Sequence, residues 1–166
     1  MKYIIQTASL SDMENITQIY AQARAFMVSH GNPSQWGNNY PDKMQLLADI
    51  SERKLYTLSD THGIHGVFYF SIERDPTYEI IYDGSWHCDR PYGVIHRIAA
   101  DGSGGILKAA VDFAAEKSDY LRIDTHADNL IMQNALAKLN FEVCGTIVLA
   151  DGSYRTAYDR FLYNRK

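Results

Sequence analysis

A glycine-rich turn between a predicted strand and a predicted helix is the strongest chemical signal in this sequence. Residues 94–100 form an apolar run typical of a buried strand, and residues 106–117 carry apolar side chains at helical spacing. The turn between them, residues 101–105, reads DGSGG. Glycines let a ligand approach the backbone closely, and the first N–H groups of a helix have no partner inside it. Such a turn is suited to binding a phosphate or pyrophosphate, but on its own it is more often a purely structural turn.

The spacing of the glycines excludes two nucleotide-binding classes. The sequence contains neither GxxxxGKS nor GxxxxGKT, so it is not a P-loop protein. The turn does not match GxGxxG and lies in the middle of the chain, which argues against a dinucleotide-dependent oxidoreductase.

Five polar or aromatic residues are candidates for substrate chemistry. His96 lies in the strand before the turn, and imidazole suits a general base near neutral pH; the alternative is a hydrogen-bonded core histidine. Asp124 and His126 are two residues apart, so they share one face of the next strand, where they contact substrate or water or simply bond the strand end. Trp36 and Tyr40 either line an acceptor pocket or pack their loop onto the core.

The elements that must position these residues follow from hydrophobic spacing and turn signals. Strands are predicted at residues 3–8, 55–59, 64–72, 94–100, 121–125, 141–149 and 154–163, with a short one near Ile80 and Ile81. Helices are predicted to begin at Ser11, with Glu14 completing a capping box, and at Pro41, Ile106 and Asn129. In the second helix, Met44, Leu47, Ile50 and Leu55 are expected on one face. The order predicts a mixed α/β fold with a mostly antiparallel central sheet flanked by helices.

Length and composition limit the function further. A chain of 166 residues with 46% hydrophobic and 22% charged residues predicts a single domain over residues 1–166. Its net charge of −4 gives no basic excess for nucleic acid. No apolar run is long enough to cross a bilayer, and the first residues do not look like a signal peptide, so we expect a cytoplasmic protein that binds no membrane.

The two cysteines, Cys88 and Cys144, lie far apart and form no CxxC pair and no zinc-ligand spacing. We therefore expect buried or incidental thiols and no metal site.

Three stretches carry a resemblance to a known family: TASLSDMENITQIYAQAR (7–24), YGVIHRIAADGSGGILKAAVDFA (92–114) and LRIDTHADNLIMQNALAKLNFEVCG (121–145). Over nearly its whole length the chain resembles the GNAT family of N-acetyltransferases. It is especially similar to a bacterial subset with HRIA, IDTH-x-DN and QW…YP segments, found here at 96–99, 123–129 and 35–41. The resemblance implies the acyl-CoA N-acyltransferase fold.

The resemblance also implies how acetyl-CoA is bound as co-substrate. The backbone of Ile98, Ala99 and Ala100 would bind the pantetheine arm, and an N–H near Ile98 would stabilise the oxyanion. The pyrophosphate would be held by backbone N–H groups of Gly102, Ser103, Gly104, Gly105, Ile106 and Leu107. Asn129 would hydrogen-bond the pantetheine, although its composition also suits a helix N-cap.

The sequence departs from the family pattern in the turn and in the expected acid. Gly104 stands where a basic residue is common, and Leu107 stands at the second glycine position. Leu136 stands where the family usually has an acid tyrosine, with Tyr154 and Tyr158 as replacement candidates. Asn140 precedes the phenylalanine where glycine is preferred, and asparagine tolerates the left-handed conformation.

These observations predict an acetyl-CoA-dependent N-acetyltransferase that modifies a primary amine of a small molecule, peptide or protein, and that is compatible with a homodimer. Leu136 and the altered turn leave a second hypothesis, a non-catalytic acyl-CoA-binding or sensing module on the same fold. A third, a nucleotide-phosphate binder without coenzyme A, is weaker because the turn lacks the lysine and hydroxyl residue of a P-loop.

Overall fold

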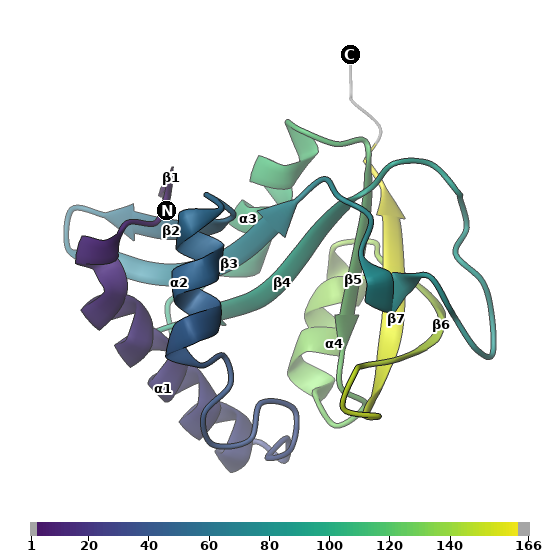
Figure 1. The fold of residues 1–166 in the computed structure, drawn as a ribbon, viewed down its shortest axis with the longest axis horizontal. Helices are drawn as coiled ribbons and strands as arrows, with labels where there is room; N and C mark the ends of the chain where they lie inside the picture. The colour runs from purple at the N-terminus through teal and green to yellow at the C-terminus, as the bar shows by residue number, and fades with distance from the viewer. Residues whose placement is uncertain (1–2, 163–166) are drawn as a thin grey trace. The chain divides into compact units, whose positions relative to one another are not determined.

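The computed structural model describes residues 3–162, whose strands form a seven-stranded sheet in the order β1-β2-β3-β4-β5-β7-β6 (Figure 1). The strands are β1 (Ile4–Thr7), β2 (Leu55–Asp60), β3 (Gly63–Ser71), β4 (Gly93–Ala100), β5 (Tyr120–Thr125), β6 (Glu142–Val148) and β7 (Tyr154–Phe161). The helices are α1 (Met13–Ser29), α2 (Lys43–Ser51), α3 (Ile106–Ala115) and α4 (Leu130–Lys138), with short 3-10 helices η1 (Leu10–Asp12) and η2 (Pro76–Tyr78).

The pairing of the strands is mostly antiparallel, as the order of elements predicts. β1 with β2, β2 with β3, β5 with β7 and β6 with β7 are antiparallel pairs. β4 and β5 are parallel and pair at Gly93 with Leu121 and at Val94 with Arg122. The mixed α/β fold class is therefore confirmed. None of the helices in residues 3–162 has the length and apolarity that a bilayer crossing requires.

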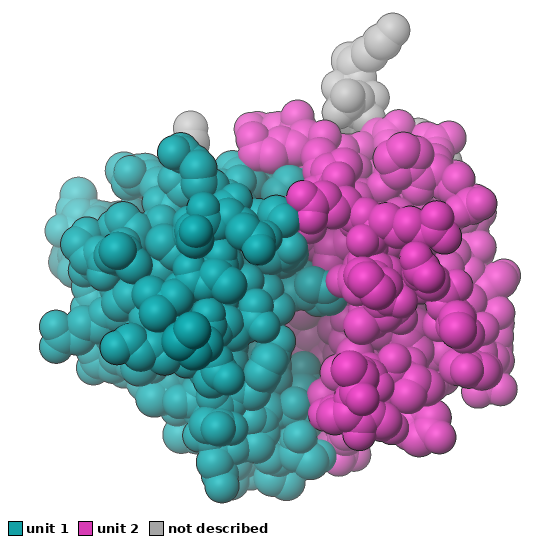
Figure 2. Space-filling model, in the orientation of Figure 1, with its two compact units in different colours: residues 1–70, 95–113 teal, residues 71–94, 114–166 magenta. Residues whose placement is uncertain are grey.

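The chain divides into two compact units (Figure 2). Unit 1 comprises residues 1–70 and 95–113, and unit 2 comprises residues 71–94 and 114–166. β4 therefore begins in unit 2 and continues into unit 1, and α3 begins in unit 1. Two compact units can still belong to one domain if they fold and unfold together. The single domain over residues 1–166 therefore stays a prediction.

In unit 1 the alternation of side chains along β3 separates two layers of packing. Val67 packs with residues of α1, α2 and β2, and with Trp36 of the connecting loop, in one core cluster. Phe68 and Phe70 turn the other way, and their rings contact Phe113 of α3 at centroid distances of 5.7 and 5.9 Å. α1 and α2 thus pack on one face of this part of the sheet and α3 on the other.

In unit 2 the long segment after β3 packs on the strands that follow it. Tyr78, Tyr92 and Tyr120 are buried in one cluster, together with Cys144 and Ile147 of β6. A lone bridge pairs Tyr82 with Thr146, and this bridge replaces the short strand predicted near Ile80 and Ile81. The prediction of a strand there was wrong because the segment is held by one bridge and by side chains, not by a ladder.

Two further local predictions differ from the structure in register. The capping box before α1 uses Ser9 and Asp12, not Ser11 and Glu14, and it starts the 3-10 turn η1 before the helix proper. In α2 the fully buried positions are Leu46 and Asp49, whereas Met44 is exposed, so the predicted apolar face is turned by about one residue. The buried carboxylate of Asp49 in this helix pairs with Arg97 of β4. The end of the last predicted strand, residue 163, lies outside the described residues.

Candidate functional site

The strand before the glycine turn is interrupted at Arg97. Its φ angle is +50°, in the left-handed region that L-residues rarely adopt, although it lies inside β4. Such a residue breaks the regular alternation of the strand and turns the backbone that follows it. The break precedes Ile98, which is the residue whose N–H the sequence predicts as an oxyanion donor.

Four residues of unit 1 hold Arg97 in this conformation. Its Nε donates to Asp49 Oδ2 at 2.9 Å and its NH2 lies 2.9 Å from the same oxygen. Its guanidinium carbon lies 4.4 Å from the centre of the Tyr69 ring, and its NH1 donates to Tyr40 Oη at 3.3 Å. Its carbonyl accepts the hydroxyl of Tyr20 at 2.6 Å. Both the side chain and the backbone of Arg97 are therefore held by neighbouring residues, which stabilises the break in β4.

Burial governs the acid–base properties of this group of residues. Burial raises the pKa of Asp49 even though the Arg97 guanidinium beside it acts in the opposite direction. Burial also raises the pKa of Tyr20 far above its ordinary value, so its hydroxyl stays protonated and donates. The pair of Asp49 and Arg97 was not foreseen from the sequence.

The other residues predicted around this strand have different environments. His96 is half-buried, and its ring centre lies 5.9 Å from that of Tyr69. Trp36 is buried in the core cluster of unit 1 and packs edge-on against Tyr20, which favours the structural alternative for this residue. Tyr40 remains 39% exposed and reaches Arg97 through its hydroxyl, so it has surface to offer a substrate.

The glycine turn leaves open space where a ligand would approach. Gly102 and Gly105 have φ angles of +100° and +81°, which glycine adopts without strain. Side-chain positions built on Gly102, Gly104 or Gly105 would meet nothing within 4 Å. The first intrahelical bond of α3 runs from Ala109 N–H to the Gly105 carbonyl (2.9 Å), so the N–H groups of residues 106–108 precede the helical ladder. The N–H of Ser103 is already donated to Asp101 at 2.9 Å.

A histidine is paired with the carboxylate that starts this turn. His65 places Nδ1 2.8 Å from Asp101 Oδ2 and Nε2 2.8 Å from Asp60 Oδ1. Hydrogen bonds to Asp101 and then Asp60 raise the pKa of His65. Partial burial opposes ionisation of Asp101, but hydrogen bonds from Ser103 and His65 prevail and lower its pKa. Protonated His65 therefore cancels negative charge beside a turn that is suited to an anion.

Comparisons with known proteins agree with this geometry. No protein-family profile matches the sequence, and no curated protein is a significant match. Among solved structures, a GNAT-family acetyltransferase from Streptococcus agalactiae matches with a TM-score of 0.85 and 27% identity, over 96% of this chain and 95% of that chain. The chain has the GNAT fold, and this match supports its resemblance to the GNAT family.

Two more distant GNAT structures share the fold. One is an acetyltransferase from Listeria monocytogenes, with a TM-score of 0.68 and 14% identity over 96% of this chain and 95% of that one. The other is a phosphinothricin acetyltransferase from Sinorhizobium meliloti in complex with acetyl-CoA, with a TM-score of 0.65 and 15% identity over 98% of this chain and 89% of that one. At this identity the two structures show the fold alone, and it is the Streptococcus agalactiae match that supports acyl transfer as the general class of reaction.

The GNAT helix that begins near Asn129 is capped by that residue. Asn129 Oδ1 accepts the N–H of Met132 at 3.1 Å, which is the role its composition suggests. Leu136 of the same helix is fully buried, so the position of the usual GNAT acid serves packing here. Of the replacement candidates, Tyr154 is 67% exposed, whereas burial of Tyr158 raises its pKa.

Asp124 and His126 do not form the common face expected for them. His126 lies beyond the end of β5, and its Nδ1 accepts the N–H of Asp128 at 3.1 Å. Asp124 accepts the hydroxyl of Tyr78 at 2.6 Å, and Tyr78 is buried in unit 2. Burial, followed by the charge of Asp124, raises the pKa of Tyr78 well above its ordinary value. The two residues therefore have separate partners, and their contact with substrate stays a prediction.

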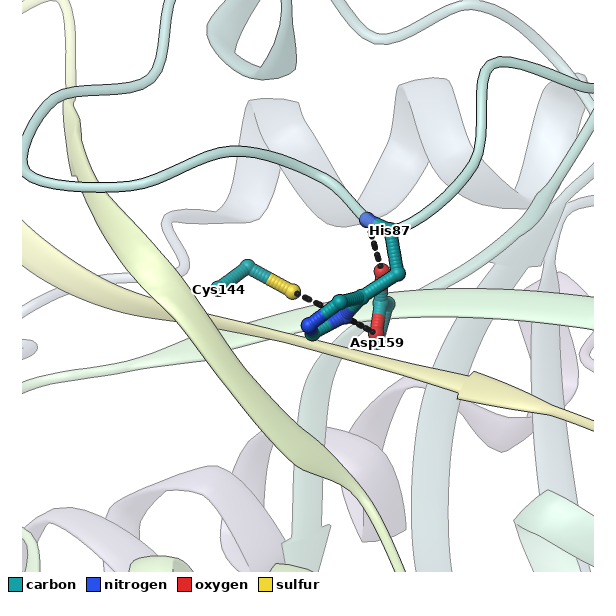
Figure 3. Close-up of side chains that lie close together, drawn as sticks. All are labelled: His87, Cys144 and Asp159. Atoms are coloured by element: carbon teal, nitrogen blue, oxygen red, sulfur yellow. Dashed lines mark hydrogen bonds and ion pairs between the residues drawn. The ribbon is translucent and has the colours of Figure 1, made fainter.

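A second cluster of reactive side chains, in unit 2, was missed by the sequence analysis. His87, Cys144 and Asp159 bring a nitrogen, a sulfur and a carboxylate oxygen within 4.8 Å of one another (Figure 3). The spacing of these residues in the chain matches no familiar motif.

Proposed function

We propose that this GNAT protein is an N-acetyltransferase that moves an acetyl group from acetyl-CoA to a primary amine. The supporting observation is the continuous run in unit 1 of a strand broken at Arg97, an open glycine turn and the start of α3 directly after Gly105. This run offers backbone hydrogen-bond groups for an extended ligand and then N–H donors and a helix dipole for its phosphates.

The cofactor contacts follow the order of the chain. Ile98 and Ala100 are half-buried while Ala99 is buried, so the strand after the break keeps partial access to solvent. Its backbone would accept the pantetheine arm as an added strand. The pyrophosphate would then face the N–H groups of Gly104, Gly105, Ile106 and Leu107. Ser103 would contribute little through its N–H, because Asp101 already accepts it.

The chemical step needs a neutral amine, an oxyanion donor and a leaving thiolate. The amine nitrogen attacks the thioester carbonyl, and the N–H near Ile98 stabilises the developing oxyanion. His96 accepts the proton that the amine loses. The C–S bond then breaks and coenzyme A leaves as a thiolate. A thiol has a low pKa (~8.5 for cysteine), so the thiolate can leave without a proton from an acid, although Leu136 stands at the position of the usual acid. Positioning supplies much of the remaining rate.

The acceptor would be the amine of a small molecule, a peptide or a protein. One structural relative is named as a phosphinothricin acetyltransferase. On this chain Tyr40 keeps exposed surface and reaches Arg97, the neighbour of His96 in β4, through its hydroxyl, so Tyr40 is the candidate to orient the acceptor.

Two measurements test the proposal. Calorimetric titration should give stoichiometric binding of acetyl-CoA, and a panel of amines should release free thiol in excess of spontaneous hydrolysis. Binding with no turnover on any amine would favour the acyl-CoA-sensing module, whose motivation is the buried leucine at the acid position. Absence of acetyl-CoA binding would overturn both readings.

A substitution at the proposed base has a matched control. His96→Gln should lower kcat about 10²- to 10⁴-fold with little change in acetyl-CoA affinity, because a positioned base contributes this much. His62→Gln, at a side chain that is 83% exposed in the β2–β3 turn, should leave kcat unchanged. An unchanged kcat in His96→Gln would show that water removes the proton.

A further inference from the structure

The cluster of His87, Cys144 and Asp159 has the donor set of a transition-metal site. His87 Nδ1 lies 3.4 Å from Cys144 Sγ and 2.7 Å from Asp159 Oδ1 (Figure 3). Two ligands of one tetrahedral zinc ion, with bonds of about 2.1 Å to nitrogen and 2.3 Å to sulfur, are separated by about 3.6 Å. The nitrogen and sulfur already have this separation. The nitrogen and oxygen would open to about 3.4 Å, which a histidine in a loop permits.

We propose that His87, Cys144 and Asp159 bind a single zinc-class divalent cation that fastens the segment between β3 and β4 to β6 and β7. Mixed nitrogen, sulfur and oxygen ligands suit a borderline ion such as Zn²⁺. One thiolate and one carboxylate cancel the two positive charges, so the site is neutral overall even though Cys144 and Asp159 are buried.

The backbone around Cys144 is built to point its side chain at this cluster. The pairing of β6 with β7 shifts between Val143 and Gly145, so Cys144 is the extra residue of a β-bulge. The carbonyl of Cys144 accepts the N–H of Ser85 at 3.0 Å, and a side chain at Gly84 would collide with that carbonyl at 1.9 Å. The segment that carries His87 therefore lies directly on the bulge, and only glycine allows this approach.

Neighbouring groups orient the ligands in the way that metal sites require. Asp159 Oδ2 accepts the hydroxyl of Tyr120 and the backbone N–H of His87 at 2.5 and 2.9 Å, which leaves Oδ1 directed at the cluster. On the other side of the imidazole ring, His87 Nε2 lies 3.9 Å from Glu142 Oε2. A carboxylate at the second nitrogen of a ligating histidine is the usual outer partner.

The position of the proton on the His87 ring distinguishes this site from a nucleophilic triad. In a triad the two ring nitrogens serve different partners, whereas here the same Nδ1 lies beside both sulfur and carboxylate. Since a carboxylate accepts, Nδ1 carries the proton in the metal-free state and does not deprotonate the thiol. On binding, the Cys144 proton would leave to solvent and the His87 proton would move to Nε2, facing Glu142. A cavity of about 380 Å³ is lined by two residues of this region, Glu142 and Asp159.

Cobalt titration of the chelator-treated, tag-free protein tests the proposal. We expect one equivalent of Co²⁺ with a thiolate-to-metal charge-transfer band, and displacement of this band by Zn²⁺. Zinc at a hundredfold excess over its Kd should raise Tm by about 5–10 °C. Cys144→Ser should abolish the band, whereas Cys88→Ser, the matched control at the other cysteine, should keep it.

Two further variants keep the test decisive if Cys144→Ser does not fold. His87→Gln, at a side chain that is 41% exposed, should remove the zinc-dependent rise in Tm without affecting the metal-free Tm strongly. Tyr120→Phe should weaken Co²⁺ binding about 10-fold or more through Asp159. Absence of a thiolate band in the native protein, or a band that survives in Cys144→Ser or His87→Gln, would overturn the proposal.

Discussion

Two helices of this protein begin in opposite ways. At the start of α4 the side chain of Asn129 accepts the N–H of Met132, so the chain satisfies its own helix. At the start of α3 stands Gly105, which has no side chain to contribute, and open space surrounds the glycines before it. Aligned peptide dipoles give both starts a positive partial charge. The side-chain cap at the start of α4 stabilises the fold, whereas the glycine before α3 leaves the start of that helix suited to an anion.

The largest expected effect comes from adding a negative charge at the open helix start. Gly104→Asp should weaken acetyl-CoA binding about 100-fold, because two unit charges ~6 Å apart repel by about 3 kcal/mol at an effective dielectric constant of ~20. Calorimetric titration measures this directly. The native fold should persist, since Gly104 does not have a left-handed φ and its side chain would enter open space.

Gly104→Asn is the matched control, because it has nearly the same shape without the charge. It should lower the affinity only a few-fold. Equal losses in the two variants would mean that steric exclusion, and not the charge at the helix start, explains the effect. Gly102 and Gly105 are poorer test positions, because their positive φ angles would add backbone strain to any substitution.

The contrast between the helix starts also shows which features local sequence can predict. The strand, the glycine turn and α3 follow one another in the chain, so spacing and glycine content were enough to predict them. The capping box before α1 was misplaced because Ser9 and Ser11 both precede an acid by three residues. The buried face of α2 was misassigned because it includes a charged residue, Asp49, whose burial depends on its pairing with Arg97.

Features that depend on distant residues were not predictable. Asp49 and Arg97 are 48 residues apart, and His87 and Asp159 are 72 apart. Which of these residues meet depends on strand pairing and on the bulge at Cys144, and neither leaves a periodic pattern in the sequence. The same reason explains why the partner of Asp124 was unforeseen: Tyr78 reaches it from a segment with little regular structure.

A smaller effect is expected at the capped helix start. Asn129→Ala should lower the free energy of unfolding by about 1 kcal/mol, because it removes the cap of α4. For a chain of this size the corresponding fall in Tm is about 2–4 °C, measurable by thermal denaturation. Asn129→Ser keeps a capping oxygen and should unfold near the native Tm.

The serine variant also separates the two roles expected of Asn129. If the residue only caps α4, Asn129→Ser should bind acetyl-CoA as the native protein does. If it also hydrogen-bonds pantetheine, as the family resemblance implies, Asn129→Ser should lose affinity while keeping its stability. A variant that loses both would show that the serine does not restore the cap.

The smallest effect concerns the charge beside the open helix start. Hydrogen bonds to Asp101 and Asp60 raise the pKa of His65, so its positive charge is fully present below about pH 6.5 and is lost as the pH rises through this raised pKa. Above it, both carboxylates remain ionised next to the turn without a balancing cation. We therefore expect acetyl-CoA affinity to fall a few-fold as the pH rises from 6 through the raised pKa of His65.

The 3′-phosphate of coenzyme A also titrates near pH 6, so acetyl-dephospho-CoA is the ligand for this titration. His65→Gln removes the titrating charge and should make the affinity nearly independent of pH, at a value near that of the native protein above the raised pKa of His65. NMR titration of the imidazole proton of His65 should give the same midpoint as the affinity. An affinity that is flat with pH in the native protein would show that Asp101 lies too far from the bound phosphates to act on them. The open start of α3 would then depend on its N–H groups and dipole alone.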